Sequence, residues 1–106
     1  MISNDVDEAF EGAEVIYAKS WGSKNFYGEP EKDIAVRAHY RDKWIVDESK
    51  MTHTNGAIFM HCLPVRRNVI VTDGVIDSPA SLVIDEAENR LHVQKAILAT
   101  LLGRED

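Results

Sequence analysis

Three short apolar runs, separated by stretches with helical spacing, constrain the fold of this chain most strongly. Residues 15–18 (VIYA), 57–60 (AIFM) and 81–84 (SLVI) are each bounded by polar or turn-forming residues. Short apolar runs of this kind are typical of strands that are buried on both faces. Because the runs alternate with helical stretches, the sequence predicts an α/β fold in which helices sandwich a parallel sheet.

Apolar spacing and capping residues mark the helical stretches. Ser, Thr and Asp favour helix starts because their side chains accept hydrogen bonds from free backbone N–H groups, and glycine favours helix ends. The connection over 19–31 is predicted to be a long loop rich in glycine and aromatic residues, and such loops are commonly functional. Helices are expected over residues 3–14, 31–42, 47–51 with Asp47 as cap, 73–77 with Thr72 as cap, and from a capping box at Asp85 and Glu88 to Gly103.

The composition limits where such a domain works and what it binds. The 106 residues suit one domain, and the net charge of −6 leaves no basic surplus for a nucleic-acid backbone. A single cysteine, Cys62, excludes an internal disulfide and favours a reducing compartment. The apolar runs are far shorter than the ~20 residues of a membrane helix, and the start lacks a signal-peptide pattern. We therefore expect a cytoplasmic domain with no nucleic-acid or membrane partner.

Unusual residues follow two of the predicted strands. In open parallel sheets, ligands bind beyond the carboxyl ends of the strands, and His61, Cys62 and the pair Arg66-Arg67 follow the run 57–60. Cys62 could act as a nucleophile beside cations, contact a ligand, or be a small buried side chain. The two arginines suit a carboxylate or a phosphate, or they pair with nearby aspartates at the surface.

Lys19 follows the first run, 15–18, in the same way. Its ammonium group suits an anionic ligand, although a lysine in a loop is more often simply exposed. Zinc has less support, because His53, His61 and Cys62 do not form the spaced ligand pairs of a closed zinc site. The chain has neither a GxGxxG nor a Walker A sequence, so no metal or nucleotide cofactor is expected.

Three sequence stretches carry a resemblance to a known family. HCLP over residues 61–64, DEAENRLHVQKA over residues 85–96 and EGAEVIY over residues 11–17 are similar to the C-terminal part of ornithine-type carbamoyltransferases. The resemblance covers nearly the whole chain. It implies a Rossmann-like amino-acid-binding domain that ends in a long C-terminal helix. It also implies an enzyme that transfers the carbamoyl group of carbamoyl phosphate to the δ-amine of an ornithine-like substrate.

The resemblance implies roles for particular residues. Cys62 and the backbone carbonyl of Leu63 are expected beside the reacting amine and the carbamoyl nitrogen, and Arg90 is expected at carbamoyl phosphate. These three are thus the expected catalytic and carbamoyl phosphate-binding residues. An arginine suits this task because it neutralises the charge that grows as phosphate leaves. Cys62 need not form a covalent bond, since orienting the amine and helping it to lose a proton is enough.

The lysine at position 19 distinguishes this chain from enzymes that use free ornithine. Those enzymes carry an aspartate that pairs with the free α-ammonium group, which Lys19 would repel. The sequence therefore resembles the N-acylornithine branch, in which Arg66 would bind the substrate carboxylate. N-acetylornithine is favoured, with N-succinylornithine (suggested by Ile70) and ornithine as alternatives. The expected substrate-binding residues are Lys19, Ser20, Trp21, His61, Cys62, Leu63 and Arg66.

The resemblance makes residues 1–106 one partial ornithine- or acylornithine-binding domain, with the carbamoyl phosphate-binding domain absent. The chain alone is therefore expected to be inactive. The full-length enzyme is expected to be a homotrimer that acts in arginine biosynthesis. A non-catalytic module that binds an acylated amino acid is the alternative from another functional class.

Overall fold

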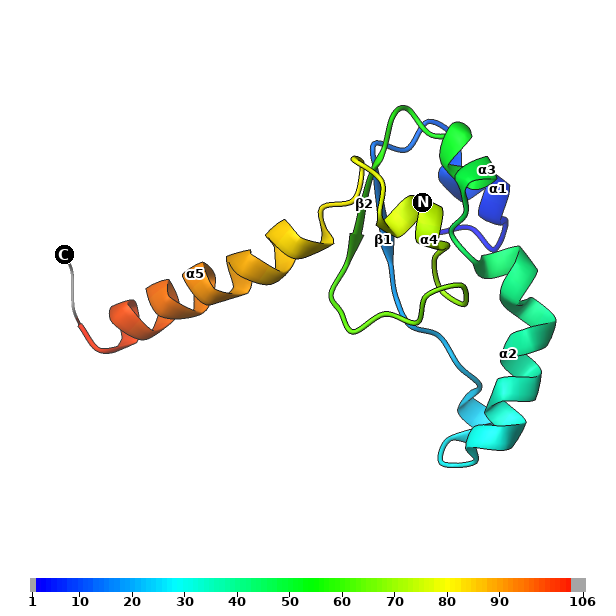
Figure 1. Ribbon diagram of the computed structural model, residues 1–106. Coiled ribbons are helices and arrows are strands. Elements are labelled where there is room, and N and C mark those ends of the chain that lie inside the picture. Colours follow the sequence, from blue (N-terminus) through cyan, green and yellow to red (C-terminus); the bar gives the residue numbers. More distant parts are fainter. Residues whose placement is uncertain (1, 104–106) are drawn as a thin grey trace.

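The computed structural model describes residues 2–103, which form helices around a short parallel sheet. Most elements gather around the two strands, whereas the last helix projects away from them (Figure 1). The elements in chain order are α1 (Val6–Phe10), β1 (Val15–Ala18), the 3₁₀ helix η1 (Lys24–Phe26), α2 (Pro30–Trp44), α3 (Glu48–Thr52), β2 (Ile58–His61), α4 (Asp73–Ile76) and α5 (Val83–Leu101).

Strands β1 and β2 pair in parallel, and their register decides which residues meet at the edge of the sheet. Val15 pairs with Ile58, and Ala18 pairs with His61. The residues that follow the two strands therefore leave the sheet at the same end (Figure 1). Both predicted strands are confirmed, β2 beginning and ending one residue later than expected.

The third predicted strand, over residues 81–84, is wrong in its extent. Ser81 makes a single parallel bridge to Phe59, and helix α5 already begins at Val83. Val83 and Ile84, which were predicted to belong to the strand, therefore lie in the first turn of α5. The same start corrects the predicted capping box, because Asp85 lies inside the first turn of α5 and not at its cap.

The other helices follow their predicted caps more closely. Asp47 caps α3 and Thr72 caps α4, each by accepting a hydrogen bond from the backbone N–H three residues later. Helix α2 confirms the predicted helix 31–42 and extends it at both ends. Helix α1 is much shorter than the predicted 3–14, because the chain leaves the helical conformation at Glu11 and turns at Gly12, which has φ of +65°. Gly103, with φ of +67°, follows the end of α5 as predicted.

The hydrophobic core lies where β1, β2 and the short helices meet. Phe59 and Val71 are completely buried in it. Helix α5 contributes only Val83 to the core and leaves Leu91 and Leu101 exposed (59% and 78%). Within residues 2–103, no helix is both long enough and apolar enough to cross a membrane. The buried core residues are Ile16, Val46, Ala57, Phe59, Val71, Val75, Ile76 and Val83.

Candidate functional site

The register of β1 and β2 brings Lys19 and Cys62 together just beyond the strand ends. Each follows the last residue of its strand, and those last residues, Ala18 and His61, pair directly. Lys19 Nζ donates to Cys62 Sγ at 3.4 Å. Two residues that the sequence singled out separately are therefore neighbours, with a positive charge beside the sulfur.

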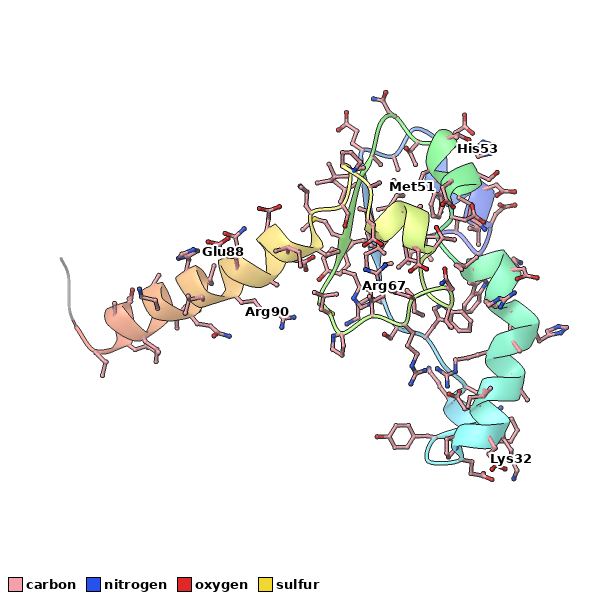
Figure 2. All side chains as sticks on the ribbon, in the orientation of Figure 1. Lys32, Met51, His53, Arg67, Glu88 and Arg90 are labelled. Carbon is pink, nitrogen blue, oxygen red and sulfur yellow. The ribbon has the colours of Figure 1, made fainter. Side chains whose placement is uncertain are left out.

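Arg90 reaches the same turn from helix α5. Its Nη2 donates to the backbone carbonyl oxygen of Cys62 at 2.6 Å. Arg90 lies in the first half of α5, and its side chain extends from the helix back toward the rest of the molecule (Figure 2). Cys62 thus lies between two cations, with Lys19 at its sulfur and Arg90 at its carbonyl. Both guanidinium and ammonium groups attract anionic ligands, so this arrangement suits a negatively charged group.

The turn after Cys62 has an unusual backbone. Leu63 has φ of +50°, in the left-handed region that side chains other than glycine rarely adopt, and its peptide bond to Pro64 is cis. The Leu63 N–H donates to His61 Nδ1 at 2.9 Å. A side chain of the preceding strand therefore holds the backbone of a predicted catalytic residue.

His61 supports this turn from the interior of the protein. Its side chain is 1% exposed, and because Nδ1 accepts the Leu63 N–H, the ring is neutral with its proton on Nε2. Burial lowers the pKa of His61, the nearby Lys19 cation lowers it further, and Glu86 opposes both effects. Nε2 has no hydrogen-bond partner among the described residues. In this structure His61 acts on the site through the backbone of Leu63.

Glu86, which sequence reasoning missed, joins helix α5 to both strands. Its Oε1 accepts from the Tyr17 hydroxyl at 2.6 Å, and its Oε2 accepts from the His61 N–H at 3.1 Å. The hydrogen bond to Glu86 is the main reason that the pKa of Tyr17 rises to about 12. Because Arg90 lies one helical turn after Glu86, this carboxylate fixes the helix that carries Arg90. Its place in the motif over residues 85–96 is the only sequence signal for this role.

The loop after β1 places Ser20 and Trp21 beside a second part of the site. The Trp21 indole packs edge-on against Trp44 of α2, with ring centroids 5.3 Å apart and planes at 79°. Three predicted substrate-binding residues, Ser20, Trp21 and Arg66, share one cavity of about 470 Å³. This loop cavity is lined by Ser20, Trp21, Asp33, Pro64, Val65 and Arg66.

The adjacent arginines Arg66 and Arg67 have different roles. Arg67 pairs with Asp73 at 2.8 Å and with Asp77 at 2.7 Å. These hydrogen bonds raise the pKa of Arg67 and lower the pKa of both aspartates. The surface-pairing interpretation therefore holds for Arg67, and Arg66 remains the candidate for ligand binding.

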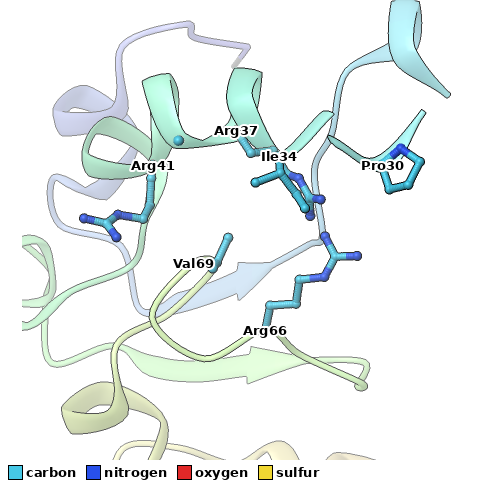
Figure 3. A pocket seen from close by; sticks show the side chains of 7 residues that line it. Pro30, Ile34, Arg37, Arg41, Arg66 and Val69 are labelled. Atoms are coloured by element: carbon cyan, nitrogen blue, oxygen red, sulfur yellow. The ribbon is translucent and has the colours of Figure 1, made fainter. Parts of the chain in front are cut away.

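Arg66 also borders a further cavity of about 450 Å³ beside helix α2. Figure 3 shows its side chain extending from the loop after β2 toward Arg37 and Ile34 of α2. The cavity is open, and its wall combines arginine side chains with apolar ones. The lining residues are Pro30, Ile34, Arg37, Ala38, Arg41, Arg66 and Val69.

The predicted site residues thus fall into two groups. The strand-end cluster contains Lys19, His61, Cys62, Leu63 and Arg90. Lys19 and Arg90 donate hydrogen bonds to Cys62, and His61 accepts from the N–H of Leu63, the residue after Cys62. Ser20, Trp21 and Arg66 instead surround the loop cavity. Among residues 2–103, no group of three or more His, Cys, Asp or Glu side chains is placed to hold a metal ion.

Comparison with known proteins assigns the chain to a family. The model of the aspartate/ornithine carbamoyltransferase Asp/Orn-binding domain matches residues 1–101. The chain is 56% identical over 103 residues to the N-acetylornithine carbamoyltransferase of Xanthomonas campestris pv. campestris. It is 50% identical over 105 residues to the ornithine carbamoyltransferase of Burkholderia cenocepacia. Each match covers 97% of the chain, and they cover 30% and 33% of the two relatives.

Solved structures agree with this assignment. A crystal structure of N-acetyl-L-ornithine transcarbamylase matches with a TM-score of 0.81 and 57% identity, over 93% of this chain and 30% of that one. Acetylornithine transcarbamylase complexed with acetylcitrulline matches with a TM-score of 0.79 and 58% identity, over 92% of this chain and 29% of that one. The chain therefore spans about 30% of the length of these relatives. It belongs to the aspartate/ornithine carbamoyltransferase family and lies within the Asp/Orn-binding domain of that family.

Proposed function

We propose that this chain forms the acceptor side of an N-acetylornithine carbamoyltransferase active site. The observation that carries the proposal is the contact of Lys19 Nζ with Cys62 Sγ, 3.4 Å apart beyond the strand ends. A cation at this place repels the free α-ammonium group of ornithine and favours an acylated, neutral α-nitrogen. The 56% identity to the Xanthomonas campestris N-acetylornithine enzyme supports the same acceptor. So does the relative that was solved with acetylcitrulline.

In the proposed reaction the δ-amine of N-acetylornithine attacks the carbonyl carbon of carbamoyl phosphate. A C–N bond forms, the C–O bond to the phosphate breaks, and phosphate leaves with the bonding electrons. The amine nitrogen loses one proton, which in the overall balance is taken up by the phosphate. We assign to Arg90 the neutralisation of the charge that grows on the leaving phosphate. Cys62 and the Leu63 carbonyl would orient the amine and the carbamoyl nitrogen at the site of attack.

The remaining predicted residues are assigned to the acceptor. Arg66 would bind its carboxylate, because a guanidinium group forms paired hydrogen bonds with a carboxylate. Lys19, Ser20 and Trp21 would contact the acylated end. His61 contributes to this proposal by holding the Leu63 backbone.

We also propose that sequence outside these 106 residues supplies the carbamoyl phosphate-binding domain, because the chain spans about 30% of its relatives. The complete protein is proposed to be a homotrimeric cytoplasmic enzyme of arginine biosynthesis that uses no metal or cofactor. Light scattering on the complete protein tests the trimer. The isolated chain should give no citrulline-type product when it is supplied with carbamoyl phosphate and N-acetylornithine.

A chimera tests the acceptor directly. In it, this sequence replaces the matching 103 residues of the Xanthomonas campestris relative. Product formation is then measured with N-acetylornithine, N-succinylornithine and ornithine, each with carbamoyl phosphate. We expect the highest kcat/KM with N-acetylornithine. A preference for either other acceptor contradicts the proposed substrate. A folded chimera that binds acceptor without turnover supports the non-catalytic module instead.

A further inference from the structure

The loop after β1 carries Lys19, Ser20 and Trp21. Its backbone is bound to helix α2 shortly after these residues, at Ser23. The Ser23 N–H donates to the Asp33 carboxylate, at Oδ1, over 2.7 Å. This short hydrogen bond has a charged acceptor, so it is stronger than one between neutral groups. The loop that is proposed to meet the acceptor is therefore held at Ser23 by a carboxylate of α2.

Asp33 is in turn held by Arg37, one helical turn later. Arg37 Nη2 lies 2.8 Å from Asp33 Oδ2, and the two side chains are only 10% and 20% exposed. Arg37 Nε is buried without a partner in the described part of the chain. One oxygen of Asp33 thus serves Arg37 and the other serves the loop, in surroundings that are largely shielded from water. This geometry fixes the direction of the carboxylate.

The loop backbone also passes very close to this carboxylate. A Cβ atom added at Gly22 would lie 3.1 Å from Asp33 Oδ1, which is tighter than an ordinary contact. A side chain at this position would push the loop and the carboxylate apart. Glycine at position 22 therefore lets the loop lie close to Asp33 without the shift of a few tenths of an ångström that a side chain would require.

The same ion pair borders the region in which Arg66 lies. Asp33 lines the loop cavity with Ser20, Trp21 and Arg66. Arg37 lines the neighbouring cavity with Arg66, toward which the Arg66 side chain extends (Figure 3). Each residue of the pair therefore lines a cavity that is shared with Arg66, the arginine that is assigned to the acceptor carboxylate.

We propose that Asp33 and Arg37 are positioning residues for the acceptor. Together they hold the loop over residues 19–23 in the conformation that meets the acylated amino acid. Neither residue touches the reacting atoms in this assignment, which rests on the proposed carbamoyltransferase function. Substitution of either residue should therefore weaken acceptor binding and leave the binding of carbamoyl phosphate unchanged.

The test uses the chimera with Asp33→Ala, and the KM for each substrate is measured separately. We expect the acceptor KM to rise about tenfold, the loss that follows removal of a hydrogen bond to a charged group. The KM for carbamoyl phosphate should stay within about twofold, as expected for a site that is not touched. Hydrogen exchange of the loop peptide over residues 19–29 should become faster in the same variant. The matched control is Asp42→Ala, which removes an exposed carboxylate of the same helix.

Two further variants keep the test decisive if Asp33→Ala does not fold. Arg37→Lys retains a charge for Asp33 and should recover most of the acceptor binding that Arg37→Gln loses. An unchanged acceptor KM in Arg37→Gln contradicts the inference, as does an equal rise for both substrates. If the unmodified chimera prefers ornithine, the proposed function fails, and the effect of Asp33 is then measured with ornithine as the acceptor.

Discussion

The loop cavity and the strand-end cluster are both held by a carboxylate, but the two carboxylates act over very different distances along the chain. Asp33 holds Ser23, ten residues away, and pairs with Arg37 on its own helix. Glu86 holds Tyr17, which is 69 residues away. The Asp33 contacts at the loop cavity thus lie within one local segment, although Pro64, Val65 and Arg66 also line that cavity. The strand-end cluster exists only when β1, β2 and α5 have assembled.

The two parts also differ in their exposure to solvent. The Asp33–Arg37 pair is largely shielded from water, and breaking a buried pair leaves an uncompensated charge. Arg90 is exposed on a helix that has a single residue in the core. Changes near Asp33 should therefore affect stability and loop order together. Changes to Arg90 should affect chemistry while the fold is retained.

The largest effect is expected for Arg90→Ala in the chimera. If Arg90 meets the charge that develops on the leaving phosphate, its loss should lower kcat about 10²–10³-fold, or ~2.7–4 kcal/mol. Steady-state kinetics with saturating acceptor measure this. Lys95→Ala removes another exposed cation of α5 and should leave kcat nearly unchanged. A loss of less than tenfold for Arg90→Ala would assign that arginine a structural role.

An intermediate effect is expected for Lys19→Asp, which reverses the charge beside Cys62. The carboxylate should attract the α-ammonium group of ornithine and lose the contact with an acylated acceptor. We expect kcat/KM to fall about tenfold for N-acetylornithine and to rise for ornithine, a shift of ~1.4 kcal/mol in each case. Competition between the two acceptors measures the change. The control Lys24→Asp alters an exposed lysine of the same loop, and an equal switch in both variants would count against Lys19.

The smallest effect is expected for Glu86→Gln. The amide keeps one acceptor oxygen, so kcat should fall only a few-fold as α5 loosens, in line with the net value of a single hydrogen bond. The clearer measurement is the ultraviolet titration of Tyr17, whose pKa should fall from about 12 toward its ordinary value of 10.0. An unaltered Tyr17 titration would show that Glu86 does not hold β1.

The raised pKa of Tyr17 determines how its hydrogen bond to Glu86 changes protein stability with pH. The folded protein holds the phenolic proton more tightly than the unfolded chain does. The contribution of this hydrogen bond to stability is therefore complete below pH 10.0 and is lost as the pH rises toward about 12. In Glu86→Gln this loss should move to lower pH, which denaturation at several alkaline pH values measures.

The fold could be predicted wherever local signals determined it. The apolar runs located β1 and β2, and Asp47 and Thr72 marked two helix starts correctly. The run over residues 81–84 could not be assigned in this way, because a short apolar run has no period that separates a strand from the start of a buried helix. The run begins with a strand-like bridge from Ser81 to Phe59 and continues as helix α5 from Val83.

Part of the candidate site could also be predicted, because local signals located the two strands that carry it. Adjacent parallel strands place their ends together, so the proximity of Lys19 and Cys62 follows from the order of the elements. Asp33 and Glu86 were missed because an acidic residue in the first turns of a helix is ordinary at a solvated surface. Their roles depend on partners that only the folded chain brings near.

Under the proposed function, the pairing of Ala18 with His61 makes acceptor preference depend on strand register as well as on residue type. A shift of β1 by one residue against β2 would move the chain by about 3.3 Å and turn Lys19 to the opposite face of the sheet. Depending on the direction of the shift, Ala18 or Ser20 would then lie beside Cys62 in place of Lys19. Under the proposed function, a change in this register would therefore change which amino acid is accepted, with every side chain of the site still present.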